Sequence, residues 1–109
     1  MTPELTQKLY DAFPRLFREL RNPDSTLGER GFECDDKCFH LVLAASLQLT
    51  AHVAMHPQLA DLRAVQVSEK LGSLRFRCRP MNDELGAMLE KIQQRSEALL
   101  MPDFLKQKE

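Results

Sequence analysis

Two cysteines and two histidines have a spacing that suits metal binding. Cys34 and Cys38 are four residues apart, and His52 and His56 repeat that interval further along the chain. Two thiolates and two imidazoles are a common ligand set for tetrahedral Zn²⁺. The segment between the pairs contains no Gly, Pro, Asn or Asp to reverse the chain, and as one helix it would hold the pairs about 20 Å apart. We therefore predict no four-ligand zinc site, and we name no metal-ligating residue and no cofactor.

The histidine pair alone leaves a second metal-binding alternative open. His52 and His56 occupy positions i and i+4 on one face of a predicted helix, where a third ligand from elsewhere would complete a site. No Glu follows His52, so the metalloprotease pattern is absent. We interpret the pair as partly exposed histidines near a helix C-terminus, where the helix dipole favours a protonated imidazole.

Cys34 is also a candidate nucleophile. The N-terminus of a helix lowers the pKa of a nearby thiol, but the adjacent carboxylates of Asp35 and Asp36 oppose that effect. We interpret the cysteines as small buried hydrophobic residues. The sequence has four glycines and lacks the glycine-rich phosphate-binding motifs and the G-x-S-x-G motif of serine hydrolases. We predict that the protein is not an enzyme, and we name no catalytic residue.

Charge is unevenly distributed along the chain. The 109 residues include 15 basic and 16 acidic side chains, with a net charge of −1, which argues against bulk DNA or an anionic bilayer as a partner. Acidic residues nevertheless gather before the second helix, and arginines alternate along a predicted strand. A row of guanidinium groups suits carboxylates or phosphates. The predicted partner-binding residues are Arg63, Arg75, Arg77, Arg79, Glu33, Asp35 and Asp36.

Helices must position most of these residues, and hydrophobic periodicity predicts where they form. The first helix follows Thr2 and continues beyond Pro14 as a short second piece over residues 16–20. An exposed loop follows over residues 22–31. The next helix, over residues 38–55, contains neither Gly nor Pro and is predicted to be the central and most buried helix.

A change of periodicity predicts strands in the second half of the chain. Apolar and polar residues alternate from Arg63 to Arg79, which indicates a β-hairpin with Gly72 in its turn. A final helix begins at Asn82 or Asp83, with a core stripe that extends to Leu99.

These elements predict a single small α+β domain over residues 1–109, with a frayed tail over residues 101–109. The order α-α-β-β-α places the helices on one face of an antiparallel β-hairpin. A two-stranded sheet is marginally stable alone, so it needs this cover or a further strand from the loops or from a second chain.

The sequence indicates a cytoplasmic location. Its longest apolar stretch, over residues 39–45, is far shorter than the roughly 20 residues that span a bilayer. The N-terminus lacks the basic start and apolar run of a secretory signal. Three cysteines are an odd number for a disulfide framework and favour reduced thiols. We therefore predict no membrane-spanning segment.

Two stretches of the chain resemble segments of a known protein family. They are GFECDDKCF over residues 31–39 and QVSEKLGSLRF over residues 66–76. They are similar to a loop of the type G-F-E-C-x-D-G-W and a hairpin of the type Q-V-K-E-K-F-G-x-L-R-F in a family of small uncharacterised bacterial and phage proteins. The chain departs from that family at Lys37 and Cys38, where the family has Gly-Trp, and it lacks the family's C-terminal C-x-x-C-G. The resemblance implies the α+β hairpin and no established activity.

Small size, missing catalytic motifs and separated charges favour a non-enzymatic protein-binding module. We expect a bacterial or phage immunity or inhibitor protein that neutralises a toxin or a host protein by docking its charged patches. The alternative is a small metal- or nucleic-acid-binding protein that uses the arginine row or Cys34, Cys38, His52 and His56. Nucleic acid is the less favoured partner, because aromatic residues are few and Trp is absent.

Overall fold

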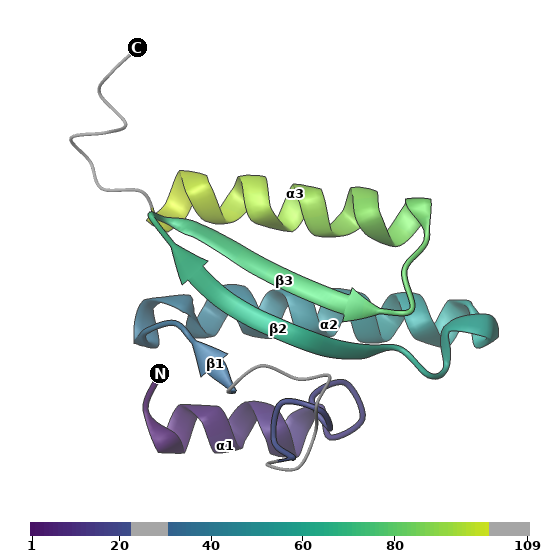
Figure 1. Cartoon of the computed structure of the whole chain (residues 1–109), viewed down its shortest axis with the longest axis horizontal. Coiled ribbons are helices and arrows are strands. Elements are labelled where there is room, and N and C mark those ends of the chain that lie inside the picture. Colours follow the sequence, from purple (N-terminus) through teal and green to yellow (C-terminus); the bar gives the residue numbers. More distant parts are fainter. Residues whose placement is uncertain (23–30, 101–109) are drawn as a thin grey trace.

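The computed structural model describes residues 1–22 and 31–100, which form a small compact α+β domain with three α-helices and a three-stranded mixed sheet (Figure 1). The predicted fold class and element order are confirmed. Most of the loop predicted over 22–31 and the tail predicted over 101–109 lie outside the described residues. In chain order the elements are α1 (Pro3–Ala12), β1 (Phe32–Glu33), the short 3-10 helix η1 (Asp36–Cys38), α2 (Phe39–Met55), η2 (Pro57–Leu59), β2 (Arg63–Lys70), β3 (Ser73–Arg79) and α3 (Asp83–Leu100).

Helix α1 begins at a capped N-terminus and ends before a proline. The Thr2 hydroxyl accepts a hydrogen bond from the Leu5 N–H at 3.3 Å, as predicted for an N-cap. The second helical piece predicted over residues 16–20 is wrong, because residues 14–21 form turns. The Leu16 carbonyl accepts from the Ala64 N–H at 2.7 Å, so this segment bonds to the end of the sheet instead of continuing a helix.

Among the side chains that the structure describes, helix α2 supplies more buried residues than α1 or α3, as predicted. Its buried side chains are Val42, Ala45, Ser46 and Leu49. Its apolar surface is wider than its buried face, however, since Leu47 is 57% exposed and Met55 is 78% exposed. The helix therefore leaves an apolar face uncovered by the described residues.

The segment Asp36–Met55, which includes α2, is longer than the apolar stretch on which the expectation of no membrane-spanning segment was based. It has 20 residues and is, by length and composition only, apolar enough to cross a membrane. The expectation considered only the apolar stretch over residues 39–45. The polar residues that follow are isolated among apolar ones, so the average hydropathy of the longer segment stays high. A core helix of a compact domain passes the same test of length and composition, and α2 contributes to such a core.

Strands β2 and β3 form the predicted antiparallel hairpin. The cross-strand pair Val67 and Phe76 faces the helices, and the arginines of β3 project from the opposite face. Leu71 and Gly72 form the turn with φ values of +54° and +81°, which is typical of the two-residue type I′ turn. The paired register shifts beside Val65, which marks a β-bulge in β2.

A third strand completes the sheet. β1 pairs in parallel with β2, with Phe32 opposite Val67, so the sheet order is β1-β2-β3. The Phe32 ring packs edge-on against Phe17, with ring centroids 5.0 Å apart. The expectation that the hairpin needs helical cover or a further strand is thus met in both ways within the chain.

Helix α3 runs along β3, the edge strand on the opposite side of the sheet from β1 (Figure 1). The Asn82 side chain caps it by accepting from the Leu85 N–H at 2.8 Å, as predicted. Ile92 lies in the core, but Leu99, predicted to extend the core stripe, is 63% exposed. The core contact at this end of α3 comes instead from Ser96, which is buried against β3.

Candidate functional site

The arginine row lies where strand alternation places it. Arg75, Arg77 and Arg79 are exposed on one face of β3, and the intervening Phe76 and Cys78 are buried. Side chains alternate between the two faces of a strand, so the three guanidinium groups share one face of the sheet. This confirms the predicted orientation of the row.

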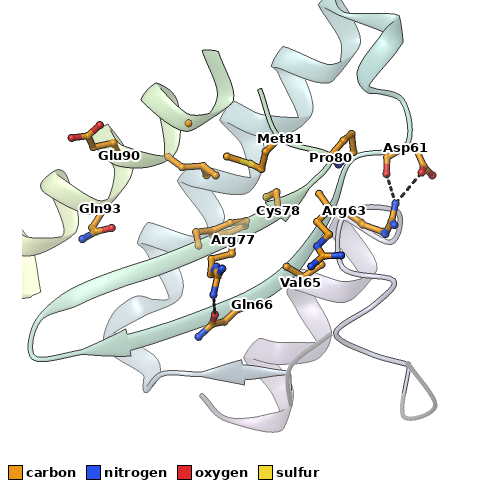
Figure 2. A pocket seen from close by; sticks show the side chains of 14 residues that line it. Asp61, Arg63, Val65, Gln66, Arg77, Cys78, Pro80, Met81, Glu90 and Gln93 are labelled. Atoms are coloured by element: carbon orange, nitrogen blue, oxygen red, sulfur yellow. Dashed lines mark hydrogen bonds and ion pairs between the residues drawn. The ribbon is translucent and has the colours of Figure 1, made fainter. Parts of the chain in front are cut away.

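A groove of about 950 Å³ lies between the hairpin and α3, beside this row (Figure 2). Its apolar lining includes Val65, Cys78 and Met81, and its polar lining includes Arg77 and Glu90. The β-bulge widens the lining, because Val65 and Gln66 together oppose a single residue of β3. The groove therefore combines an apolar floor with charged groups at its margins.

Two of the three arginines line the groove. Arg77 donates a long hydrogen bond of 3.4 Å to the side-chain oxygen of Gln66 (Figure 2). Within residues 1–22 and 31–100, neither Arg77 nor Arg79 forms an ion pair with a carboxylate. Arg75 is on the same face but is not part of the groove lining.

Arg63, the fourth arginine of the predicted set, is held by carboxylates of the chain itself. Its guanidinium lies 2.9 Å from the Asp61 carboxylate and 3.8 Å from the Glu19 carboxylate. Asp61 also pairs with Arg18 at 2.8 Å. The Arg63 side chain is only 20% exposed, so it contributes to the wall of the groove and leaves Arg77 and Arg79 as the accessible cations.

The three acidic residues of the predicted site are not one free patch. The Asp35 carboxylate caps η1 by accepting from the Lys37 N–H at 3.0 Å. Asp36 accepts from the Thr2 N–H at 2.8 Å, while the N-terminal amino group donates to the Cys34 carbonyl. Asp35 and Asp36 therefore hold local structure and the start of the chain.

Glu33 is exposed on β1 and shares a sheet face with the arginine row. The pairing places Glu33 opposite Ser68, and Ser68 opposite Arg75, in one line across the three strands. Adjacent strands are about 4.8 Å apart, so the acidic and basic residues that the sequence separates lie about 10 Å apart here. Of the three predicted acidic residues, the fold therefore places Glu33 on the same face as the arginine row.

The three thiols are in environments that favour their neutral form. Burial raises the pKa of Cys34 and of Cys78 to about 12, and it also raises the pKa of Cys38. Cys38 and Cys78 are buried as predicted, and Cys34 is half-buried. A thiolate nucleophile needs a lowered pKa, so none of these cysteines has the electrostatics of one.

The histidine pair is separated from the cysteine pair, as the helix length predicts. Among the described side chains, the group that brings metal-ligating atoms together is His52, His56 and Glu84, and it includes no cysteine. Glu84 comes from the first turn of α3. Sequence analysis missed it, because 27 residues lie between it and His56 and no spacing motif joins them.

Comparison with protein-family models, with curated proteins and with solved structures gives no match. The resemblance stated above therefore rests on residues 31–39 and 66–76. These two stretches contact each other in the fold, since Phe32 and Glu33 of the first pair with Val67 and Ser68 of the second. The groove and its arginines are thus the features from which function must be argued.

Proposed function

We propose that the protein is a non-enzymatic binding module whose groove receives an acidic, partly apolar segment of a partner protein. The observation that carries this proposal is the position of Arg77 and Arg79, exposed beside a groove of about 950 Å³ with no carboxylate paired to either among the described residues. Both guanidinium groups have the planar donor geometry that binds a carboxylate through two parallel hydrogen bonds.

The apolar floor supplies the second part of the recognition. Val65, Met81 and Leu89 line the groove and give a partner side chain apolar surface to cover. Burial of apolar area contributes about 25 cal/mol per Å², while exposed ion pairs contribute about 1 kcal/mol or less each. Apolar contact therefore supplies affinity, and the arginines select the sign of charge and orient the segment.

The lining favours a peptide over a nucleic acid. Phe76 is the aromatic residue of the lining, and it is only 6% exposed, so it offers no platform on which bases stack. Nucleic acid binding is retained as a competing outcome of the experiment below.

Covering a surface of the partner is the mode of action that we propose, as an immunity protein or an inhibitor does with a toxin or a host protein. Such a protein needs a rigid surface and no reacting groups, in agreement with the raised pKa values of the thiols. The free cysteines suit a reducing compartment, so we place the proposed activity in the cytoplasm.

Binding of short peptides tests the groove without knowledge of the natural partner. A labelled peptide of alternating Glu and Leu is expected to bind more tightly than the matched peptide of Lys and Leu. The double variant Arg77→Glu, Arg79→Glu should weaken binding of the acidic peptide at least tenfold and leave the melting temperature unchanged, because both side chains are exposed. The matched control is Arg75→Glu, which changes the same face outside the groove and should reduce binding less than threefold.

Two results would overturn this proposal. One is equal binding of the acidic and basic peptides; the other is tighter binding of a single-stranded RNA or DNA oligomer with the same dependence on Arg77 and Arg79. A photo-crosslinking residue extends the test to natural partners. At Gln93, in the groove, it should trap a protein in lysate of the native cells that the double variant does not trap, whereas at Gln48 on α2 it should trap no such protein.

A further inference from the structure

Three potential ligands meet where the end of α2 approaches the start of α3. His52 is in the last turn of α2, His56 is its C-cap, and Glu84 is in the first turn of α3. One ligand atom from each of these residues lies within 4.8 Å of the other two. The i, i+4 spacing puts both imidazoles on the same side of α2, and tertiary packing supplies the carboxylate.

The hydrogen bonding of His56 prepares one ring nitrogen for a metal. His56 Nδ1 is 2.9 Å from the His52 carbonyl oxygen, and because a carbonyl only accepts, Nδ1 carries the proton in this bond. The neutral imidazole then has its lone pair on Nε2, which lies 3.9 Å from Glu84 Oε2. A backbone carbonyl that fixes the tautomer in this way is the usual support of a metal-binding histidine.

A second observation that points to a bound ion, independent of the distances between the three residues, comes from His52. Its Nε2 is buried and has no hydrogen-bond partner in the part of the chain that the structure describes. A buried ring nitrogen without a partner is uncommon, and a bound ion is one of the few explanations for it. The His52 and His56 rings are stacked, with centroids 4.1 Å apart and planes at 24°, so the two rings are nearly parallel at the same end of α2.

We propose that His52, His56 and Glu84 bind one divalent transition-metal ion, with Zn²⁺ as the best fit, and that this ion links α2 to α3. Two neutral imidazoles and one carboxylate, with water in the fourth position, are an established tetrahedral ligand set for Zn²⁺. Ligand atoms of such a site are about 3.4 Å apart, so the present atoms would have to approach by about 1 Å. The stacked imidazole rings would also have to rotate, so that the lone pairs of both rings point to the same ion. Glu84 is 64% exposed, which leaves its side chain free to make that adjustment.

The position of the site gives the ion a structural role. Met81 and Gly86 flank Glu84 in sequence, and both line the groove between α3 and the hairpin. An ion held by α2 and by the first turn of α3 would fix that wall of the groove. It would stabilise the folded protein by an amount that rises with the logarithm of the free zinc concentration above Kd, because the unfolded chain does not hold the three ligands together.

Calorimetric titration of untagged, chelator-treated protein with zinc chloride tests the proposal. The expected result is one zinc ion per chain and a melting temperature that rises by about 10 °C at free zinc 100-fold above Kd. Glu84→Gln and His56→Ala should each weaken zinc binding at least tenfold. The matched controls are Glu90→Gln, an exposed carboxylate on the same helix, and His40→Ala, the third histidine, at the other end of α2; neither should change the affinity.

The Glu84→Gln variant is expected to fold, because the side chain at this position is exposed. A loss of zinc binding in this variant can therefore be assigned to the missing ligand and not to unfolding. The absence of stoichiometric zinc binding would overturn the proposal, since the group would then be only the 3.9 Å contact between His56 and Glu84. Zinc binding that persists in both Glu84→Gln and His56→Ala would also overturn it. Replacement of zinc by Co²⁺ gives a second readout, since a tetrahedral site produces strong visible absorption that the two variants should lose.

Discussion

The backbone N–H of Leu74 donates a 2.8 Å hydrogen bond to the side-chain oxygen of Ser96, and the same hydroxyl donates to the Gln93 carbonyl at 2.6 Å. Leu74 is in β3, an edge strand, where an N–H group on the outer side has no strand partner. The pair therefore closes this edge of the sheet with α3. It also sets the separation of α3 from β3, which form two walls of the groove.

Ser96→Ala is expected to lower the free energy of unfolding by about 1–3 kcal/mol, because it leaves the buried Leu74 N–H without an acceptor. Urea unfolding measures the change. Ser73→Ala is the control, since its hydroxyl makes a 3.3 Å contact with Glu97 at a half-buried site and should contribute less. Equal effects of the two substitutions would contradict the importance given to the Leu74 contact.

The turn of the hairpin offers a stabilising substitution. Leu71 has φ of +54°, a conformation that costs an L-residue with a bulky side chain about 1–2 kcal/mol, and its side chain is 83% exposed. Leu71→Asn creates the Asn-Gly sequence that type I′ turns prefer. We expect the free energy of unfolding to rise by about 1 kcal/mol in urea unfolding, whereas Leu71→Val should lower it. A loss of stability in Leu71→Asn would mean that the Leu71 side chain has a role in the fold.

Two substitutions at Gly86 distinguish an effect on the stability of α3 from an effect on the space in the groove. A Cβ at this position would meet only the Met81 side chain, at 3.9 Å, so Gly86→Ala should stabilise the helix by about 0.5–1 kcal/mol. Gly86→Phe would project a ring into the groove that Gly86 lines. We expect binding of the acidic peptide to persist in the alanine variant and to fall at least tenfold in the phenylalanine variant. Unchanged binding in Gly86→Phe would place the peptide outside the groove.

The raised pKa of the Cys34 thiol predicts that the free energy of unfolding falls at alkaline pH. Burial raises its pKa to about 12 from an ordinary value of 9.0. Between these values the unfolded thiol loses its proton while the folded thiol keeps it, so rising pH favours the unfolded state. Stability that is fully present below pH 9 should therefore decline toward pH 12, by at most about 1.4 kcal/mol per pH unit from this group.

Urea unfolding of the wild type and of Cys34→Ala between pH 8 and pH 11 measures that decline. The slope of stability against pH should be smaller in the variant, whatever its stability at pH 8. Identical slopes would show that the Cys34 thiol ionises as readily in the folded protein as in the unfolded chain.

Local signals in the sequence account for most of the elements. The Thr2 and Asn82 caps, the proline that ends α2 and the alternation along β3 depend on neighbours within a few residues, and each gave the correct element. β1 escaped prediction because a two-residue strand has no periodicity, and it exists through its pairing with Val67 and Ser68.

The candidate site could be predicted only in part, because some of its contacts, like those of β1, join residues that are distant in sequence. Alternation placed the three arginines of β3 on one face, but the ion pairs that hold Arg63 depend on Glu19 and Asp61, which the fold brings to it. Glu84 reaches the histidines only after α3 folds back along the sheet. Contacts between distant segments carry no sequence signal of their own, so these features required the structure.

We propose that the groove between the hairpin and α3 receives an acidic segment of a partner. Titration of ¹⁵N-labelled protein with the alternating Glu-Leu peptide, followed by amide chemical shifts, tests this directly. We expect saturable shifts concentrated at residues 63–66, 76–81 and 86–93, which are absent in the double variant Arg77→Glu, Arg79→Glu. Shifts confined to α2, or shifts that remain in the double variant, would contradict it.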